Sequence, residues 1–462
     1  MSFACDQEQA ERLGRAVRFR TVTITSESAR EDPRYAEFSS FLSFLMEAFP
    51  RAAAGLTWEK LGDLAFLLSW GPPAGTTSRP PILFYSHYDV VPAGNESAWT
   101  HPPFGGVVAE GHVWGRGTLD DKGVLMALME TVESLLKAGF CPDRTLYLAF
   151  GGDEETLGER GAGTITRALA DRRVRLGCLF DEGSAITQGI VPFVSRPVAT
   201  IGLAEKGFAS IEVTVTGTQG HSSMPGRGTA AGALSVVMAA IERNRFPARL
   251  TPLVARFFSA VAPHAGGAVG IALRLLRLLW PFLRGALTAN PSVDALLRTT
   301  QAVTILQSGQ VPNVIPADAR AVVNLRLLPG DGTAGALARV ERVARAALPA
   351  GFSVRVRFVP GDALSEPVAE ARVEPALWKA VEKSIRLVQP DAVIAPFLVL
   401  GATDSRTFAA RSEAIVRFMP VTLTSEDLAR IHGVDERISL ENYGRMIAFY
   451  QNLIRAAAGG NA

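Results

Sequence analysis

A histidine and an aspartate stand two residues apart in the segment SHYDVVP, as His87 and Asp89. Residues two apart on a β-strand point to the same side. A metal-bound histidine usually donates its other ring N–H to a carboxylate, and a His-x-Asp pair at a strand end suits that contact. The pair also occurs by chance in proteins without a metal, so its meaning depends on the rest of the chain.

Carboxylates follow three further segments of the chain. GRGTLDDKG places Asp120 and Asp121 in a glycine-flanked loop, and LFDEG ends a strand-like run with Asp181 and Glu182. FGGDEETLG puts three adjacent carboxylates at positions 153–155, directly after an apolar run. Adjacent carboxylates repel one another unless a cation neutralises them. Each segment taken alone is equally compatible with a solvated turn, which Asp and Gly favour.

Taken together, these segments favour a metal site. If the strands are parallel, their carboxylates and the histidine converge at one edge of the sheet. Carboxylates with imidazole suit Zn²⁺ or, less selectively, Mn²⁺ or Co²⁺. Three carboxylate ligands and two neutral histidines facing two Zn²⁺ leave one positive charge, which a bound hydroxide cancels. Two metals can hold that hydroxide and polarise a carbonyl, and a further carboxylate can carry the proton.

The elements that must position these residues alternate between strand and helix. Strand-like apolar runs at 81–92, 145–150 and 176–183 and a helical stretch at 124–136 predict an α/β sheet covered on both faces. From Gly207 the pattern becomes β-α-β-β-α-β, which is typical of a ferredoxin-like domain. We therefore expect an inserted domain at 207–360 and a discontinuous catalytic domain at 1–206 and 361–462.

Composition narrows the class of protein. The 462 residues carry 47 basic and 45 acidic side chains, and a net charge of +2 gives no reason to expect nucleic acid. Three widely spaced cysteines predict neither a disulfide framework nor a thiolate cluster. The N-terminus reads as an amphipathic helix with Ala10, Leu13, Ala16 and Val17 on one face, and not as a signal peptide. No apolar run is long enough to span a bilayer, and we expect a cytoplasmic protein.

The motifs SHYDVVP, GRGTLDDKG, GGDEE, LFDEG, GHSSMPG, PNVIP, GATDSR and HGVDERI, in this order between residues 86 and 438, resemble those of the aminoacylase and carboxypeptidase S peptidase family. Within it, the chain looks most similar to carboxypeptidase S and the N-acyl amino acid hydrolases. The resemblance implies a phosphorylase/hydrolase-like α/β catalytic domain with two Zn²⁺ per subunit and an inserted lid that pairs two subunits in a homodimer. It also implies cleavage of an amide bond next to a free carboxylate.

The resemblance further implies a set of metal ligands. One zinc would be bound by His87, Asp120 and Asp181, and the other by Asp120, Glu155 and His432, with Asp120 bridging the two.

Catalytic roles are implied for other residues of the same motifs. Glu154 would be the general base, Asp89 would orient His87, and the Asp120–Asp121 peptide would be cis. His221, in the inserted domain, would stabilise the oxyanion, often in the partner's site. Substrate contacts are implied for Asn313, Arg326, Gly401 and Thr403.

The stretch from Thr251 to Thr300 departs from simpler relatives. It contains IALRLLRLLWPFL, in which Arg274, Arg277 and Arg284 share one helical face and several leucines lie largely on the other. Three readings stay open: a helix packed on its own domain, an apolar wall that receives an acyl chain, and a helix lying on a membrane surface.

Three hypotheses for function follow from the sequence. The first is a dizinc hydrolase of N-acyl amino acids or small peptides, and the second is a dipeptidase or carboxypeptidase of the same mechanism. The third, a catalytically inactive binding protein, is disfavoured because all five expected ligands and Glu154 are present.

Overall fold

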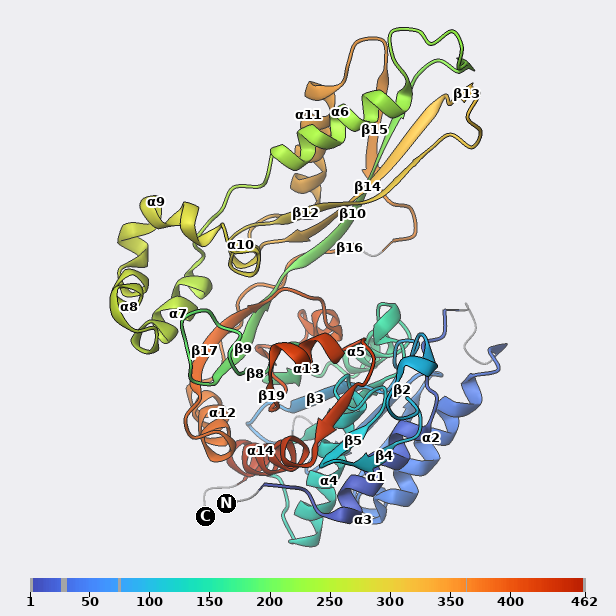
Figure 1. Cartoon of the computed structure of the whole chain (residues 1–462). Coiled ribbons are helices and arrows are strands. Elements are labelled where there is room, and N and C mark those ends of the chain that lie inside the picture. The colour runs from blue at the N-terminus through green and yellow to red at the C-terminus, as the bar shows by residue number, and fades with distance from the viewer. Residues whose placement is uncertain (1–2, 26–30, 74–75, 363, 460–462) are drawn as a thin grey trace.

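The structure is a computed structural model that describes residues 3–25, 31–73, 76–362 and 364–459. Figure 1 shows a broad α/β body below and an elongated, smaller body above it. A ten-stranded sheet runs through the larger body in the order β1-β2-β6-β3-β7-β18-β9-β8-β19, with β17 paired to β9. None of the helices in the described ranges combines the length and hydropathy that crossing a bilayer requires.

The middle of this sheet is parallel. β3 (Ile82–His87) lies between β6 (Leu146–Gly151) and β7 (Cys178–Asp181) and is parallel to both. Every residue of these three strands is buried. Phe84 belongs to the core on the side of α4 (Lys122–Lys137), whereas Leu83 belongs to the core on the side of α5 (Ala162–Asp171). Burial on both faces explains why these strands read as continuous apolar runs.

The other elements of the catalytic domain complete the layers of helices and the ten-stranded sheet, or form a separate sheet of three short strands in the order β20-β5-β4. They are α1 (Gln7–Arg18), α2 (Tyr35–Ala48), α3 (Pro50–Gly55), β1 (Thr57–Leu61), β2 (Ala65–Trp70), β4 (Val107–Ala109), β5 (His112–Trp114), β8 (Ile186–Thr187), β9 (Val198–Glu205), α12 (Pro375–Val388), β17 (Val393–Val399), β18 (Ile415–Arg417), β19 (Thr422–Leu423), α13 (Ser425–Arg430), β20 (Arg437–Ser439) and α14 (Leu440–Ala458). The predicted α/β class is confirmed, and the predicted apolar face of α1 is buried.

The lid has the β-α-β-β-α-β order expected from the sequence. Its antiparallel sheet runs β12-β14-β10-β15, an arrangement typical of ferredoxin-like domains. The two helices share one core with the strands. The elements are β10 (Gly207–Thr216), β11 (Gly220–His221), α6 (Ala230–Arg243), β12 (Thr300–Ser308), β13 (Val314–Ile315), β14 (Asp318–Leu327), α11 (Thr333–Ala347), β15 (Ser353–Phe358) and β16 (Leu364–Ser365).

The segment between α6 and β12 differs from the expectation. It forms α7 (Pro252–Val261), α8 (Gly267–Arg274), α9 (Leu276–Leu287) and α10 (Pro291–Leu297), so the helix expected around residue 275 is broken there. The segment lies inside the lid sequence, yet its apolar residues join the core of the catalytic domain. Phe257 of α7 packs edge-on against Phe397 of β17 at 5.5 Å between ring centroids. Burial of the apolar side of α7 against β17 explains this placement.

One residue, Lys206, separates β9 of the catalytic sheet from β10 of the lid. Its side chain is buried, and its Nζ donates to the carbonyl oxygens of Ala295 (2.9 Å) and Arg298 (2.8 Å). The preceding Glu205 is buried and pairs with Arg417 at 2.6 Å. The two sheets are therefore joined by a nearly continuous strand whose junction is anchored to the end of α10.

A buried carboxylate fixes the loop that carries Asp120. Oε1 of Glu436 accepts hydrogen bonds from the backbone N–H groups of Gly117, Leu119 and Asp120, at 2.8 to 3.1 Å. Its Oε2 pairs with Arg116 at 2.6 Å, and both side chains are inaccessible to solvent or nearly so. Gly117 has φ +90°, a conformation that favours glycine. The loop is thus shaped around one carboxylate.

We predict that Glu436→Ala lowers the free energy of unfolding by about 3–5 kcal/mol, because it leaves the Arg116 guanidinium buried without its partner. Urea unfolding followed by circular dichroism measures the change. Glu426→Ala is the control, since Glu426 is exposed and its ion pair with Arg430 is worth at most about 1 kcal/mol. Equal effects of the two substitutions would contradict the importance assigned to Glu436.

Candidate metal centre

Asp120 lies at the centre of a cluster of ionisable side chains. Its Oδ1 is 2.9 Å from Nε2 of His87, and its Oδ2 is 2.9 Å from Nε2 of His432. The two oxygens of one carboxylate thus face two different imidazoles, which is the arrangement that a bridging ligand between two metals needs. The Asp120–Asp121 peptide is cis, as the resemblance implied.

Each side of Asp120 is completed by one more carboxylate. Glu182 has its Oε1 at 3.6 Å from Nε2 of His87, and Glu155 has its Oε1 at 3.2 Å from Nε2 of His432. The ligand atoms of each triad, His87–Asp120–Glu182 and Asp120–Glu155–His432, lie within 4.8 Å of one another. Two three-residue sites therefore share Asp120.

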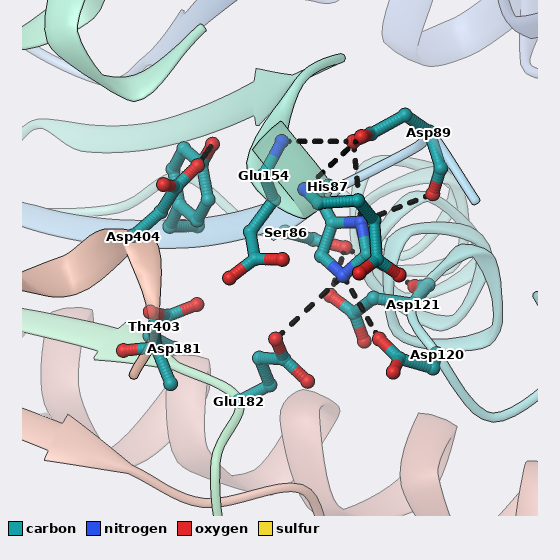
Figure 2. A network of polar contacts seen from close by, with 12 residues as sticks. Ser86, His87, Asp89, Asp120, Asp121, Glu154, Asp181, Glu182, Thr403 and Asp404 are labelled. Carbon is teal, nitrogen blue, oxygen red and sulfur yellow. Dashed lines mark hydrogen bonds and ion pairs between the residues drawn. The ribbon is translucent and has the colours of Figure 1, made fainter. Parts of the chain in front are cut away.

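The structure places Glu182, and not the expected Asp181, in the first of these triads. Asp181 is the last residue of β7, and its Oδ2 accepts a hydrogen bond from the backbone N–H of Ser405 at 2.9 Å. Figure 2 shows Glu182 directed toward His87, with a dashed contact between them, whereas no contact joins Asp181 to His87. Consecutive residues of an extended chain point to opposite sides, so only one of the two can face His87.

Asp89 organises the residues around the cluster (Figure 2). It is fully buried, and its carboxylate accepts hydrogen bonds from the backbone N–H groups of Glu154 (3.1 Å) and Glu155 (3.2 Å) and from the hydroxyl of Thr23 (2.8 Å). Nδ1 of His87 lies 3.1 Å from the Asp89 carbonyl oxygen and 3.4 Å from Oδ1. These contacts occupy Nδ1 and leave Nε2 of His87 directed at the cluster.

Burial and charge shift the titration of the cluster in a way that fits a cation. Burial raises the pKa of Glu182 to about 7. Hydrogen bonds to Asp120 and Glu155 raise the pKa of His432 to about 10. When no cation is near, the crowded carboxylates are therefore neutralised by protons that they hold themselves or that the neighbouring histidine holds. A donor set of three carboxylates and two imidazoles fits two divalent metals, which would displace those protons.

Glu154 belongs to neither of the two triads that share Asp120, but its carboxylate lies within 4.8 Å of ligand atoms of His87 and Glu155. Its backbone N–H is held by Asp89, while Figure 2 shows its carboxylate directed to the side of the cluster where Glu182 lies. Burial raises the pKa of Glu154 well above its usual range. A carboxylate with a raised pKa close to metal ligands can accept a proton and later return it.

The residues expected to bind substrate are dispersed. Thr403 is buried, and its hydroxyl bonds to Glu205 (3.1 Å) and Ser405 (2.5 Å), whereas Gly401 is exposed. Arg326 is partly buried on β14, over the ring of Phe208. His221 and Asn313 are exposed near the paired strands β11 and β13, which Figure 1 places at the end of the lid far from the catalytic sheet.

A cavity of about 630 Å³ opens beside the first triad. Its lining residues include Asp120 and Glu182, and these two are the only charged members of the lining within the described ranges. The remaining wall is mostly apolar and comes from the catalytic domain and from the helices that the 251–300 segment forms. Leu273, Leu283 and Leu287 contribute to it, while Leu276 and Leu279 do not.

Known proteins resemble the chain over nearly its whole length. A probable carboxypeptidase S-like protein 2 of Dictyostelium discoideum is 35% identical over 97% of this chain and 85% of its own. The N-fatty-acyl-amino acid synthase/hydrolase PM20D1 of Homo sapiens is 33% identical over 97% of this chain and 87% of its own. The crystal structure of the M20 family metallo-carboxypeptidase Sso-CP2 from Sulfolobus solfataricus shares the fold, with a TM-score of 0.70, 17% identity, and coverage of 98% of this chain and 99% of that one.

A family model described as peptidase family M20/M25/M40 matches residues 83–456, which include both triads and Glu154. With relatives above 30% identity along nearly all of the chain, the resemblance seen in the motifs is confirmed. The chain is a metal-dependent amide hydrolase and belongs to peptidase family M20/M25/M40.

Proposed function

We propose that the chain hydrolyses N-acyl amino acids with long apolar acyl chains, using two zinc ions held by His87, Asp120, Glu155, Glu182 and His432. The observation that carries the substrate class is the cavity beside the first triad. It is of a size typical of ligand sites, its charged residues lie at the metal end, and the rest of its wall suits a hydrocarbon chain.

The residues divide the reaction between them. When bound, two divalent metals polarise the scissile carbonyl and make water nucleophilic near neutral pH. Glu154 takes the proton from the attacking water and delivers it to the leaving amide nitrogen. Asp89 fixes the positions of both groups for these steps, because it accepts a hydrogen bond from the backbone N–H of Glu154 and contacts the ring of His87. Arg326 and the loop at Gly401 are proposed to receive the free carboxylate, for which a guanidinium is well suited.

A dipeptidase or carboxypeptidase activity is the second candidate, because several relatives are named as carboxypeptidases. A dipeptide would bring a charged amine into the cavity. Beyond Asp120 and Glu182, which are assigned to the metals, no described lining residue carries a negative charge to receive that amine. Burying an unpaired ammonium group is costly, so the cavity favours an acyl chain. A cytoplasmic location stays a prediction from the sequence.

Three single substitutions distinguish the metal ligands from the general base. Glu182→Ala should lose metal and activity, Asp181→Ala should keep both metals, and Glu154→Gln should keep both metals while turnover falls by on the order of a hundredfold or more. Elemental analysis after dialysis, together with turnover, measures each outcome. Metal loss in Asp181→Ala with retention in Glu182→Ala would reverse the ligand assignment. Full activity of metal-free wild type would refute the metal mechanism.

Acyl-chain length gives the test of the cavity. Each CH₂ buried there is worth about 0.8 kcal/mol, so affinity should rise roughly fourfold per methylene until the cavity is full. If this binding is the same in ground and transition states, KM changes and kcat changes far less.

Leu283→Ser and Leu287→Ser should weaken the dependence of KM on acyl length and leave the hydrolysis of acetyl substrates unchanged. Leu279→Ser is the matched control, since Leu279 lies on the same helix but outside the cavity lining. If the affinity of the wild type does not depend on acyl-chain length, the cavity does not bind the acyl chain. Dipeptidase activity then becomes the first candidate function.

We also propose a homodimer paired through the lid, in which His221 stabilises the oxyanion in the partner's site. The exposed position of His221 near the far end of its own lid supports this. Mixing a His221→Ala chain with a Glu154→Gln chain should restore part of the activity once subunits exchange, because one site of the mixed dimer then has both groups. Failure to regain activity in a verified mixed dimer would contradict the shared site.

A further inference from the structure

Helices α8 and α9 carry a row of exposed apolar side chains. Ile271 is 61% exposed, Leu275 at the break between the helices 46%, Leu278 74% and Phe282 83%. Ile271 and Leu275 are four residues apart and share one side of α8 and its C-terminal cap, and Leu278 and Phe282 are four residues apart on one side of α9. Figure 1 shows α8 and α9 at the outer left edge of the molecule. Contiguous apolar residues at such a site mark an interaction surface.

The charged residues of the segment that carries this row are all basic. From Thr251 to Val293 the chain contains no Asp or Glu, although 45 acidic residues are present in the whole sequence. Arg274, Arg277 and Arg284 of α8 and α9 are exposed. The whole chain has a net charge of only +2, so this concentration of positive charge is local.

The helices that carry this row also line the acyl cavity. At about 100° per residue, Leu278 and Phe282 face away from the side of α9 that carries Leu287. Leu283 and Leu287 line the cavity, so one helix presents its apolar residues to the cavity and to the exterior. Phe193, which is 73% exposed, lines the cavity as well.

We propose that α8 and α9 bind the surface of anionic lipid bilayers. Leu278 and Phe282 enter the boundary between headgroups and acyl chains, and the three arginines contact the phosphate groups. A helix pair with exposed Leu and Phe beside Arg and without acidic residues has the composition of an interfacial anchor. Where the proposed function holds, this contact also brings the helices that line the cavity to a lipid phase in which long-chain N-acyl amino acids partition.

The arginines favour a bilayer over a second copy of the chain as the occupant of this surface. In a two-fold dimer the same patch meets itself, so the three arginines of each copy would face those of the other. The segment offers no carboxylate to receive them. Anionic headgroups supply the opposite charge at high density.

The test uses the full-length, metal-loaded protein and its co-sedimentation with lipid vesicles. Vesicles of phosphatidylcholine alone are compared with vesicles in which about one third of the lipid is phosphatidylglycerol, at low and high salt. We expect binding to the anionic vesicles that weakens with salt. Arg277→Gln with Arg284→Gln should lower that partitioning roughly 25-fold. Leu278→Ser with Phe282→Ser should lower it by roughly a hundredfold, because both apolar insertions are lost.

Matched controls lie on α12 of the catalytic domain. Leu387→Ser removes a leucine that is 42% exposed, and Arg386→Gln removes an exposed arginine, and both should bind vesicles like the wild type. Hydrolysis of a soluble acetyl amino acid, measured without vesicles, should be unchanged in all of these variants. If neither the wild type nor any variant hydrolyses this substrate, the proposed function is refuted, and the result of the vesicle experiment still stands.

Two outcomes would overturn the proposal. One is wild-type protein that stays in solution with anionic vesicles at low salt. The other is a Leu278→Ser, Phe282→Ser variant whose particle mass in solution is half that of the wild type, because the surface would then be an interface between copies.

Discussion

Mutual repulsion among buried carboxylates is the constraint on which this molecule is built. Asp120, Glu155 and Glu182 are drawn together with two imidazoles where little water can screen them. Such a group is stable only when protons or cations neutralise it. Asp120 contacts both imidazoles, because its two oxygens lie at equal distances of 2.9 Å from Nε2 of His87 and Nε2 of His432. The family's metal chemistry follows from this unfavourable electrostatic arrangement.

Two further buried carboxylates hold the cluster in place without belonging to it. Asp89 accepts from the backbone of residues 154 and 155, and Glu436 accepts from the backbone of the loop before the Asp120–Asp121 peptide. Both use fixed N–H donors, so ligand positions depend on main-chain geometry and less on side-chain rotamers. His432 itself has φ +59°, a conformation that is uncommon outside glycine and is kept only where the surrounding structure determines it.

The sequence predicted the fold class well because both domains have clear periodicity. Continuous apolar runs indicated strands covered on two faces, and alternation indicated the half-exposed lid sheet. It located the cluster because carboxylates followed those runs. It could not decide between Asp181 and Glu182, since that choice depends on which side of the sheet the last residue of β7 faces. The side-chain parity of the strand, with Leu179 and Phe180 in different cores, was the available signal. The role of Glu436 depends on contacts more than 300 residues apart in the chain, which no local pattern reveals.

The anchoring of Lys206 connects the junction between lid and catalytic domain to one wall of the cavity. Its ammonium group is bound by carbonyl oxygens of Ala295 and Arg298, while Val293 and Leu296 of the same short helix line the cavity. A ligand that displaces α10 must move those carbonyls, and the strand junction with them. The strand junction and the apolar wall of the cavity are thus connected through one short helix.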